Sequence, residues 1–449
     1  MRVAVINNSL ISKGDIRMEG KFFLNENSLL CMPLERNLSK CVALESIADV
    51  MNPPVFKRQF CSPTERAVQY FQSSDVNLAA EYSSVYVYKP QAERIKAIVH
   101  KGDILVTGFG TIGNTRLVSK HQDGVCYANN VARIRTKGEV LNGYIYAFIT
   151  SKYGSAQLNK NASGSVVRYI EAPGIKKSLI PIPPESFQQE VDDLIQESAR
   201  LREEAADALQ QAIQQVEDTI PYPSKQKVGC VSSRTILFSH NRRFEANYYI
   251  SEGHDIEEYI YRNFKWEPLG QVCEDISRPD IFKRYYVQNG IVFLGGADIF
   301  LASPDSKKQL SKTKTTNITS LAIKENTILI PRSGTIGNVA WAHAGHAQKL
   351  ASEDVIRLQP NDILRGGYIY AFLSSSIGKA LIQKHIFGSV IQHIEPPHLK
   401  LIPIPIIEDS IIDNIHKLVI EYSKKVGKAI VNERQAISMI EQEIESWTK

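Results

Sequence analysis

The most regular pattern of apolar and polar positions lies in two long segments, one in mid-chain and one at the end of the sequence. Glu185–Thr219 contains neither glycine nor proline, and Gln188–Asp218 is rich in strong helix formers. Apolar residues recur there at alternating steps of three and four, and the segment after Pro405 repeats this spacing. Seam positions are Val191, Leu194, Leu201, Leu209 and Ile213 in the first segment, and Ile411, Ile415, Leu418, Ile437 and Ile444 in the second.

A one-sided apolar stripe needs a partner, so we expect the two helices to pair as an antiparallel coiled coil. The alternative is that each helix lies separately on its own domain. A helix of about 34 residues, rising 1.5 Å per residue, is roughly 50 Å long, or about 15 base pairs of DNA.

Shorter patterns predict mixed domains around these helices. Asp103–Thr107 and Asn326–Ile330 are short β-branched runs bounded by turn residues, which is typical of strands. Tyr144–Asn159 and Tyr368–His385 carry apolar residues at helical spacing. The predicted fold class is therefore α+β.

The chain is an internal duplication. Gly143–Phe148 recurs unchanged as Gly367–Phe372, and between residues 143–176 and 367–400, 17 of 34 positions are identical. The turn Gly110–Asn114 recurs as Gly334–Asn338. Leu-Ile-Pro-Ile-Pro, which begins at Leu179 and again at Leu401, is expected to be an extended strap, because proline lacks a backbone donor.

The duplication and the helices together give a domain plan. Residues 1–185 and 223–405 are predicted to form two equivalent domains, and residues 186–222 and 406–449 the two spacer helices. Antiparallel pairing of the spacers would make the whole a pseudo-two-fold dumb-bell.

Composition narrows the class of protein only slightly. The 449 residues contain 53 Lys and Arg against 48 Asp and Glu, a net charge of +5 that permits a polyanionic partner. No apolar run approaches the length of a membrane span, and no secretory leader is evident, so we expect a soluble protein that is not exported. The six cysteines form no CxxC pair, which disfavours a zinc ribbon.

The chain carries few signs of catalytic chemistry. Gly108–Gly113 fits the GxGxxG pattern of dinucleotide-binding folds, but its repeat, Arg332–Gly337, begins with arginine, which argues against a nucleotide site. Asn52–Val55 lacks the aromatic residue of an amino-methyltransferase loop. His343 and His346 are interpreted as surface histidines without a metal. We expect no catalytic residue, metal or cofactor in this chain.

Comparison of the two copies suggests how DNA would be bound. Phosphate contacts can be shared between repeats, whereas side chains that read different bases must differ. The Gly-Thr-Ile-Gly-Asn element is either a purely structural turn or a contact loop. The candidate phosphate-binding residues are Lys57, Arg58, Thr111, Asn114, Lys283, Arg284, Thr335 and Asn338. The candidate base-reading residues are Phe109, Arg116, Arg168, Tyr169, Arg332, Ser333, Gln392 and His393.

With its tandem domains, its Arg332–Gly337 turn and its Leu179–Pro184 strap, the whole chain resembles the specificity subunit of type I restriction-modification systems. This resemblance implies a non-catalytic, cytoplasmic prokaryotic protein whose two target recognition domains read a bipartite site on double-stranded DNA. It also implies two methyltransferase partners that carry S-adenosylmethionine, ATP-dependent restriction subunits joined through them, and no membrane. Related subunits serve other methylation-based phage-defence systems. Ile406–Ser410 lacks the glutamine-rich start seen in Glu185–Glu190, so the two docking faces are not expected to be identical.

Two other classes of protein stay open from the sequence. One is a single-chain DNA methyltransferase or nuclease with duplicated recognition domains, which would bind S-adenosylmethionine by itself. The other is a protein-interaction scaffold without nucleic acid, which would show no salt-dependent binding of duplex DNA.

Overall fold

The computed structural model describes residues 25–164, 167–221, 230–239, 243–361, 363–388 and 390–447. The chain divides into two units, residues 1–203 with 428–449, and residues 204–427. Each unit therefore holds one repeat and about half of each long helix. Residues 222 and 223, where the predicted spacer meets the second domain, lie outside the described residues.

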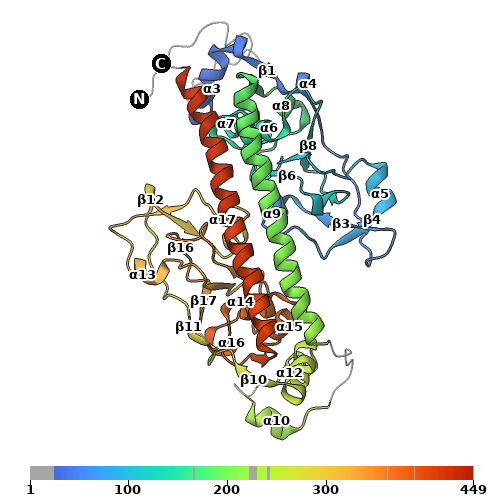
Figure 1. Ribbon diagram of the computed structural model, residues 1–449, viewed down its shortest axis with the longest axis vertical. Coiled ribbons are helices and arrows are strands. Elements are labelled where there is room, and N and C mark those ends of the chain that lie inside the picture. Colours follow the sequence, from blue (N-terminus) through green and yellow to red (C-terminus); the bar gives the residue numbers. More distant parts are fainter. Residues whose placement is uncertain are drawn as a thin grey trace. The chain divides into compact units, whose positions relative to one another are not determined.

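The first repeat is built from short helices and strands (Figure 1). Its helices are α3 (Glu26–Arg36), α4 (Leu44–Ile47), α5 (Lys89–Arg94), α6 (Asn142–Thr150), α7 (Lys152–Lys160) and α8 (Ala172–Lys176). Its strands are β1 (Cys41–Ala43), β2 (Ala48–Met51), β3 (Ala67–Phe71), β4 (Tyr86–Tyr88), β5 (Ile104–Thr107), β6 (Thr115–Leu117), β7 (Cys126–Tyr127), β8 (Val131–Thr136) and β9 (Leu179–Pro181).

The second repeat has a corresponding set of elements. Its helices are α10 (Ser233–Phe238), α11 (Ala246–Tyr249), α12 (Glu252–Asn263), α13 (Ile318–Leu321), α14 (Gly366–Ser374), α15 (Ser376–Lys384) and α16 (Pro396–Leu399). Its strands are β10 (Lys265–Pro268), β11 (Cys273–Ser277), β12 (Tyr286–Leu294), β13 (Gln309–Leu310), β14 (Ile328–Pro331), β15 (Ala340–Trp341), β16 (Leu350–Ala351), β17 (Val355–Pro360) and β18 (Pro403–Ile406).

Strand order confirms the duplication. A four-stranded sheet runs β2-β8-β5-β6 in the first repeat and β11-β17-β14-β15 in the second. A three-stranded sheet runs β4-β3-β7 and β13-β12-β16, in each case with one antiparallel and one parallel neighbour. The straps β9 and β18 pair with β1 and β10 in two-stranded sheets, where proline can be accommodated at an edge. The α+β prediction is confirmed.

The helix predicted over Tyr144–Asn159 is two helices, as is its repeat. The break falls at Ser151, whose hydroxyl accepts a hydrogen bond from the Gly154 N–H at 3.3 Å and so caps α7. Ser375 caps α15 on Gly378 in the same way, at 3.2 Å. A Cβ at Gly154 would lie 2.3 Å from the Phe148 carbonyl oxygen, so the sharp corner requires glycine there.

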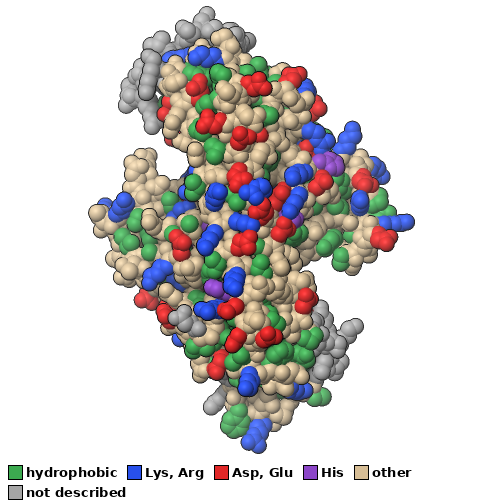
Figure 2. Space-filling model, viewed as in Figure 1, with side chains coloured by type: hydrophobic (Ala, Val, Ile, Leu, Met, Phe, Trp, Pro, Cys, Tyr) green, Lys and Arg blue, Asp and Glu red, His purple; other side chains and the backbone are tan. Residues whose placement is uncertain are grey.

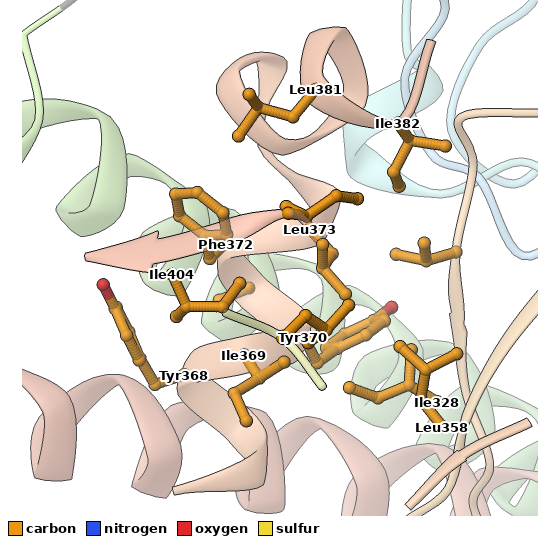
Figure 3. Packing of buried hydrophobic residues seen from close by; sticks show 14 of the residues in the cluster. Ile328, Leu358, Tyr368, Ile369, Tyr370, Phe372, Leu373, Leu381, Ile382 and Ile404 are labelled. Carbon is orange, nitrogen blue, oxygen red and sulfur yellow. The ribbon is translucent and has the colours of Figure 1, made fainter. Parts of the chain in front are cut away.

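In each unit the core lies between the four-stranded sheet and the paired short helices. Figure 3 shows this packing in the second unit, where Tyr370 of α14 lies beside Ile328 and Leu358 of the sheet. Tyr368 and Phe372 lie on the other side of α14, near Ile404 of β18. The repeated Gly-Tyr-Ile-Tyr-Ala-Phe sequence is therefore buried core in both copies.

The long helices are α9 (Glu185–Thr219) and α17 (Asp409–Ser446), and both units show them packed antiparallel (Figure 1). In the first unit, the Ser198 hydroxyl donates to the Ala429 carbonyl at 2.9 Å, and Arg202 pairs with Glu433 at 2.6 Å. In the second unit, Glu204 pairs with Lys425 at 2.8 Å. The Asn414 amide donates to Gln215 at 2.9 Å. The spacer after β18 begins at Asp409 instead of 406, because the strap extends to Ile406.

The buried face of these helices is wider than the predicted seam. The predicted seam residues that are buried are Val191, Leu201, Ile415 and Ile444. Those that are only partly buried are Leu194, Leu209, Ile213, Ile411, Leu418 and Ile437. Additional buried positions are Ile195, Ala212, Ile412, Val419 and Ala436. Each helix packs on its own repeat as well as on the other helix, so it buries a broad stripe instead of a narrow seam. The predicted pairing is confirmed, and the alternative of two separate helices is wrong.

The prediction that His343 and His346 lie on the surface is wrong. His343 and His346 are buried, with ring centroids 4.3 Å apart. The Nε2 atom of the His346 ring lies 3.0 Å from the Ile299 carbonyl oxygen, and the backbone N–H of His343 donates to the Nδ1 atom of the same ring at 3.4 Å.

Within the described ranges we find no helix with the length and apolar character that a membrane crossing demands.

Burial of His346 predicts acid sensitivity of the second unit. Burial lowers the pKa of His346 from 6.5 to about 4, so the unfolded chain binds a proton that the folded chain excludes. The free energy of unfolding should therefore fall as the pH drops from about 6.5 to about 4, by roughly 3 kcal/mol in total from this group. Urea unfolding at several pH values would show a shallower acid loss in His346→Gln than in the parent chain. Equal slopes would contradict the assignment.

Candidate nucleic-acid interface

The Gly-Thr-Ile-Gly-Asn element forms the turn between β5 and β6, and between β14 and β15 in the second repeat. Gly110 and Gly113 have φ values of +74° and +88°, which side chains other than glycine rarely adopt. The Thr107 hydroxyl donates to the Thr111 carbonyl at 2.5 Å and accepts from the Asn114 N–H at 3.0 Å. Both readings of this element fit: the turn is structural, and its tip, with Thr111, is exposed.

A second loop pairs with each turn. In the first repeat, Tyr169 bridges to both Phe109 and Ser163. In the second repeat, His393 bridges to Ser333 and Phe387 in the same arrangement. The structure thus brings together most of the base-reading candidates of each repeat, although they lie about 60 residues apart in sequence.

In the first repeat the paired loops present an aromatic surface. The rings of Phe109 and Tyr169 stack with centroids 5.4 Å apart and an interplanar angle of 13°, and each residue is 37% exposed. Arg168 is exposed next to Tyr169 and donates to the Asn159 carbonyl. Flat exposed rings beside a guanidinium are suited to contact with bases.

In the second repeat the same place is polar and charged. Arg332 donates to Glu395 at 2.7 Å and lies 3.4 Å from the His393 ring nitrogen. The same guanidinium nitrogen lies 3.5 Å from an Asp354 carboxylate oxygen. Gln392 is exposed and lines a hollow together with Gly334 of the turn. The two repeats therefore hold different chemistry on an equivalent backbone.

Arg116 does not belong to this surface, contrary to the prediction. Only 8% of its side chain is exposed, and its guanidinium binds Glu81 at 2.7 Å and the Leu78 carbonyl at 2.7 Å. Ser119 donates to the same carboxylate at 2.5 Å. The residue is a buried ion-pair partner that links β6 to the segment between β3 and β4, where it cannot reach a base.

The repeated Lys-Arg pairs lie on the loop between β2 and β3 and on its equivalent between β11 and β12. Lys57 and Lys283 are exposed. The two arginines are more restrained: Arg58 donates to the Tyr70 hydroxyl at 2.6 Å, and Arg284 pairs with Glu353 at 2.6 Å. The lysines are thus the freer cations of each pair.

Sequence reasoning missed an aliphatic residue beside each pair. Val55 is 87% exposed and Ile281 83% exposed, and each is followed by a half-buried phenylalanine and the Lys-Arg pair. The signal was present as the repeated pattern aliphatic-Phe-Lys-Arg. An exposed aliphatic side chain next to cations fits an apolar contact with DNA, such as a thymine methyl group or a base step.

These cations predict a change in the salt dependence of DNA binding. Lys57→Ala should reduce the slope of log K against log salt by about 0.9, the value for one lost phosphate contact, and combining it with Lys283→Ala should double the change. Titrations of the assembled complex with duplex DNA at several salt concentrations would measure it. Lys57→Arg, which keeps the charge, is the matched control. An unaltered slope in the double variant would remove both lysines from the interface.

The two α+β domains share a Lys-Arg pair and differ in the side chains of their paired loops. This combination defines a class of protein, a DNA-reading scaffold with two recognition modules. The sequence matches the family described as type I restriction modification DNA specificity domain, once over residues 39–207 and again over residues 262–433. The chain belongs to this family, and it is a DNA sequence-recognition subunit. The resemblance drawn from the repeated motifs is confirmed.

Among solved structures, the chain is matched by subunits of type I restriction-modification systems. The S subunit of a type I restriction-modification system from M. genitalium is 13% identical, with a TM-score of 0.37, and the match covers 89% of this chain and 95% of that one. The HsdS subunit from Thermoanaerobacter tengcongensis is 15% identical, with a TM-score of 0.29, over 90% and 95% of the two chains. No curated protein matches the chain.

Proposed function

We propose that each repeat reads one half of a bipartite DNA site, with residues 1–185 and 223–405 as the two target recognition domains. The observation that carries this is the equivalence of backbone and the divergence of side chains at the paired loops. The Ile170 N–H donates to the Gly108 carbonyl at 2.8 Å, and the Ile394 N–H donates to the Arg332 carbonyl at 3.0 Å. One scaffold thus displays a glycine and an aromatic stack in one copy, and an arginine and a histidine in the other.

The proposal assigns the chemistry to partner subunits. Two methyltransferase subunits would dock on the spacer helices, residues 186–222 and 406–449, and would supply S-adenosylmethionine for methylation of adenine. Restriction subunits dependent on ATP would join through them. Figure 2 shows Lys and Arg side chains interspersed with Asp and Glu over α9 and α17, a surface suited to a protein partner with mixed charge.

The test is reconstitution with the methyltransferase partner. The isolated chain should bind no S-adenosylmethionine in a calorimetric titration, whereas the complex should bind it and should bind duplex DNA with a steep salt dependence. Appreciable binding by the isolated chain would favour a single-chain methyltransferase. Absence of salt-dependent duplex binding by the complex would favour a scaffold without nucleic acid.

A further inference from the structure

Glu171 and Glu395 occupy equivalent places next to the paired loops. Each is the N-cap residue of a short helix, α8 or α16, with extended backbone angles of −120° and 172° or −126° and 157°. Each directly follows the isoleucine that bonds to the turn, Ile170 or Ile394. The two carboxylates therefore start from the same backbone position beside the candidate base-reading residues.

In the second repeat this carboxylate is occupied. Glu395 accepts hydrogen bonds from the Nε atoms of Arg278, at 2.8 Å, and Arg332, at 2.7 Å. Burial opposes ionisation, yet the hydrogen bonds from Arg332 and Arg278 hold the pKa of Glu395 below its ordinary value. Its lone pairs serve to fix two guanidinium groups.

In the first repeat both arginines are missing. Gly108 stands in place of Arg332. Strand register identifies the other position: Met51 pairs with Arg133 as Ser277 pairs with Arg357, so Asn52 corresponds to Arg278.

Asn52 is also directed elsewhere. Its amide oxygen accepts from the Ala172 N–H at 2.8 Å, and its amide nitrogen donates to the Asn129 carbonyl at 3.3 Å. Glu171 is exposed and, within the described ranges, takes part in no ion pair. The first repeat thus presents an open carboxylate at the point where the second presents a neutralised one.

An open carboxylate on a DNA-binding surface can have only certain neighbours. Phosphates repel it, so its favourable contacts are hydrogen-bond donors on base edges. In the major groove guanine offers only acceptors, adenine sets its N7 acceptor beside its amino group, and cytosine offers the N4 amino group without an adjacent acceptor. A lone carboxylate therefore fits cytosine best.

We propose that Glu171 is a specificity-determining residue of the first repeat, which accepts a hydrogen bond from the N4 amino group of a cytosine in the first half-site. The inference rests on the proposed function. The ion pairs of Glu395 with Arg278 and Arg332 prevent the same reading in the second repeat, and so one loop architecture reads two different half-sites.

The test compares Glu171→Gln and Glu171→Ala with Glu395→Gln in the complex with its methyltransferase partner, using sequencing of methylated DNA. Glutamine can bond to both N6 and N7 of adenine, so Glu171→Gln should shift one first-half position from cytosine towards adenine by at least tenfold. Glu171→Ala should relax that position. The gap and the second half-site should be unaltered in both. Glu395→Gln should leave the first half-site intact.

A modified duplex tests the atom itself and remains informative where a variant methylates poorly. Replacing that cytosine with 2-pyrimidinone removes the N4 amino group, which should weaken binding by the parent complex at least tenfold more than binding by Glu171→Ala. An equal loss in both, an unchanged motif in the Glu171 variants, or a first half-site without a G·C pair would overturn the assignment. Failure of the proposed function is a separate result, in which the parent complex produces no methylation motif.

Discussion

Insertion of one heptad into α9 after Glu203 and one into α17 before Lys428 is expected to lengthen the gap between the two half-sites by about three base pairs. Seven helical residues add about 10.5 Å, and a base pair occupies about 3.4 Å. Glu204 pairs with Lys425 close to both insertion points, so the paired insertions keep the apolar faces of the helices in register. The half-site sequences should not alter, because the repeats are untouched.

Sequencing of methylated DNA would measure the gap directly. A heptad inserted into α9 alone is the matched control, since it displaces the two helices relative to each other and should destabilise the protein without defining a new gap. The spacer account would be wrong if the double insertion methylated the original site with its original gap.

Substitution of Gly108 by alanine is expected to abolish reading of the first half-site. A Cβ there would lie 2.4 Å from the Ile170 carbonyl oxygen and 3.2 Å from that of Asn130, and both are backbone atoms that cannot rotate away. The turn and the loop of Tyr169 would have to separate. Methylation requires both half-sites under our proposal, so we expect its rate to fall at least 100-fold.

Arg332→Ala is the matched substitution in the second repeat, where the backbone already accommodates a Cβ. It should relax one half-site position without disrupting the turn, and methylation should persist. Methylation assays with both variants, together with thermal melts to verify folding, would check the contrast. Normal activity of Gly108→Ala would mean that the paired loops do not read DNA.

The sequence alone predicted the features that depend on local chemistry and repetition. The match of Gly143–Phe148 with Gly367–Phe372 revealed the duplication. The absence of glycine and proline over Glu185–Thr219 predicted α9, although the spacer was placed at 186–222 and the helix spans Glu185–Thr219. Prolines at the ends of the repeats predicted the edge straps. These features can be recognised without knowing which elements contact each other in the folded protein.

Features that depend on tertiary neighbours could not be predicted in this way. Ile195 is more deeply buried than Leu194 because the repeat packs on α9 beside the second helix, which heptad spacing does not reveal. Arg116 resembles a surface cation until its partner Glu81, 35 residues away, is seen. Likewise, the close spacing of His343 and His346 does not show that both rings are buried.

The candidate site combines both kinds of feature. Phe109, Tyr169, Arg332 and His393 were selected because they differ between copies, and the structure brings them together in pairs. Their proximity depends on the backbone bridge between the turn and a loop about 60 residues further on. Glu171 was missed because it is identical in the two repeats, and its distinct role lies in the absence of the two arginines that hold Glu395.

Sequencing of methylated DNA from cells with and without this gene tests the central claim most directly. If the two repeats are two recognition modules, methylation should depend on the gene. The methylated motif should consist of two different half-sites separated by a fixed gap of unspecified bases. A continuous motif, two identical half-sites, or a methylation pattern indifferent to the gene would contradict the account.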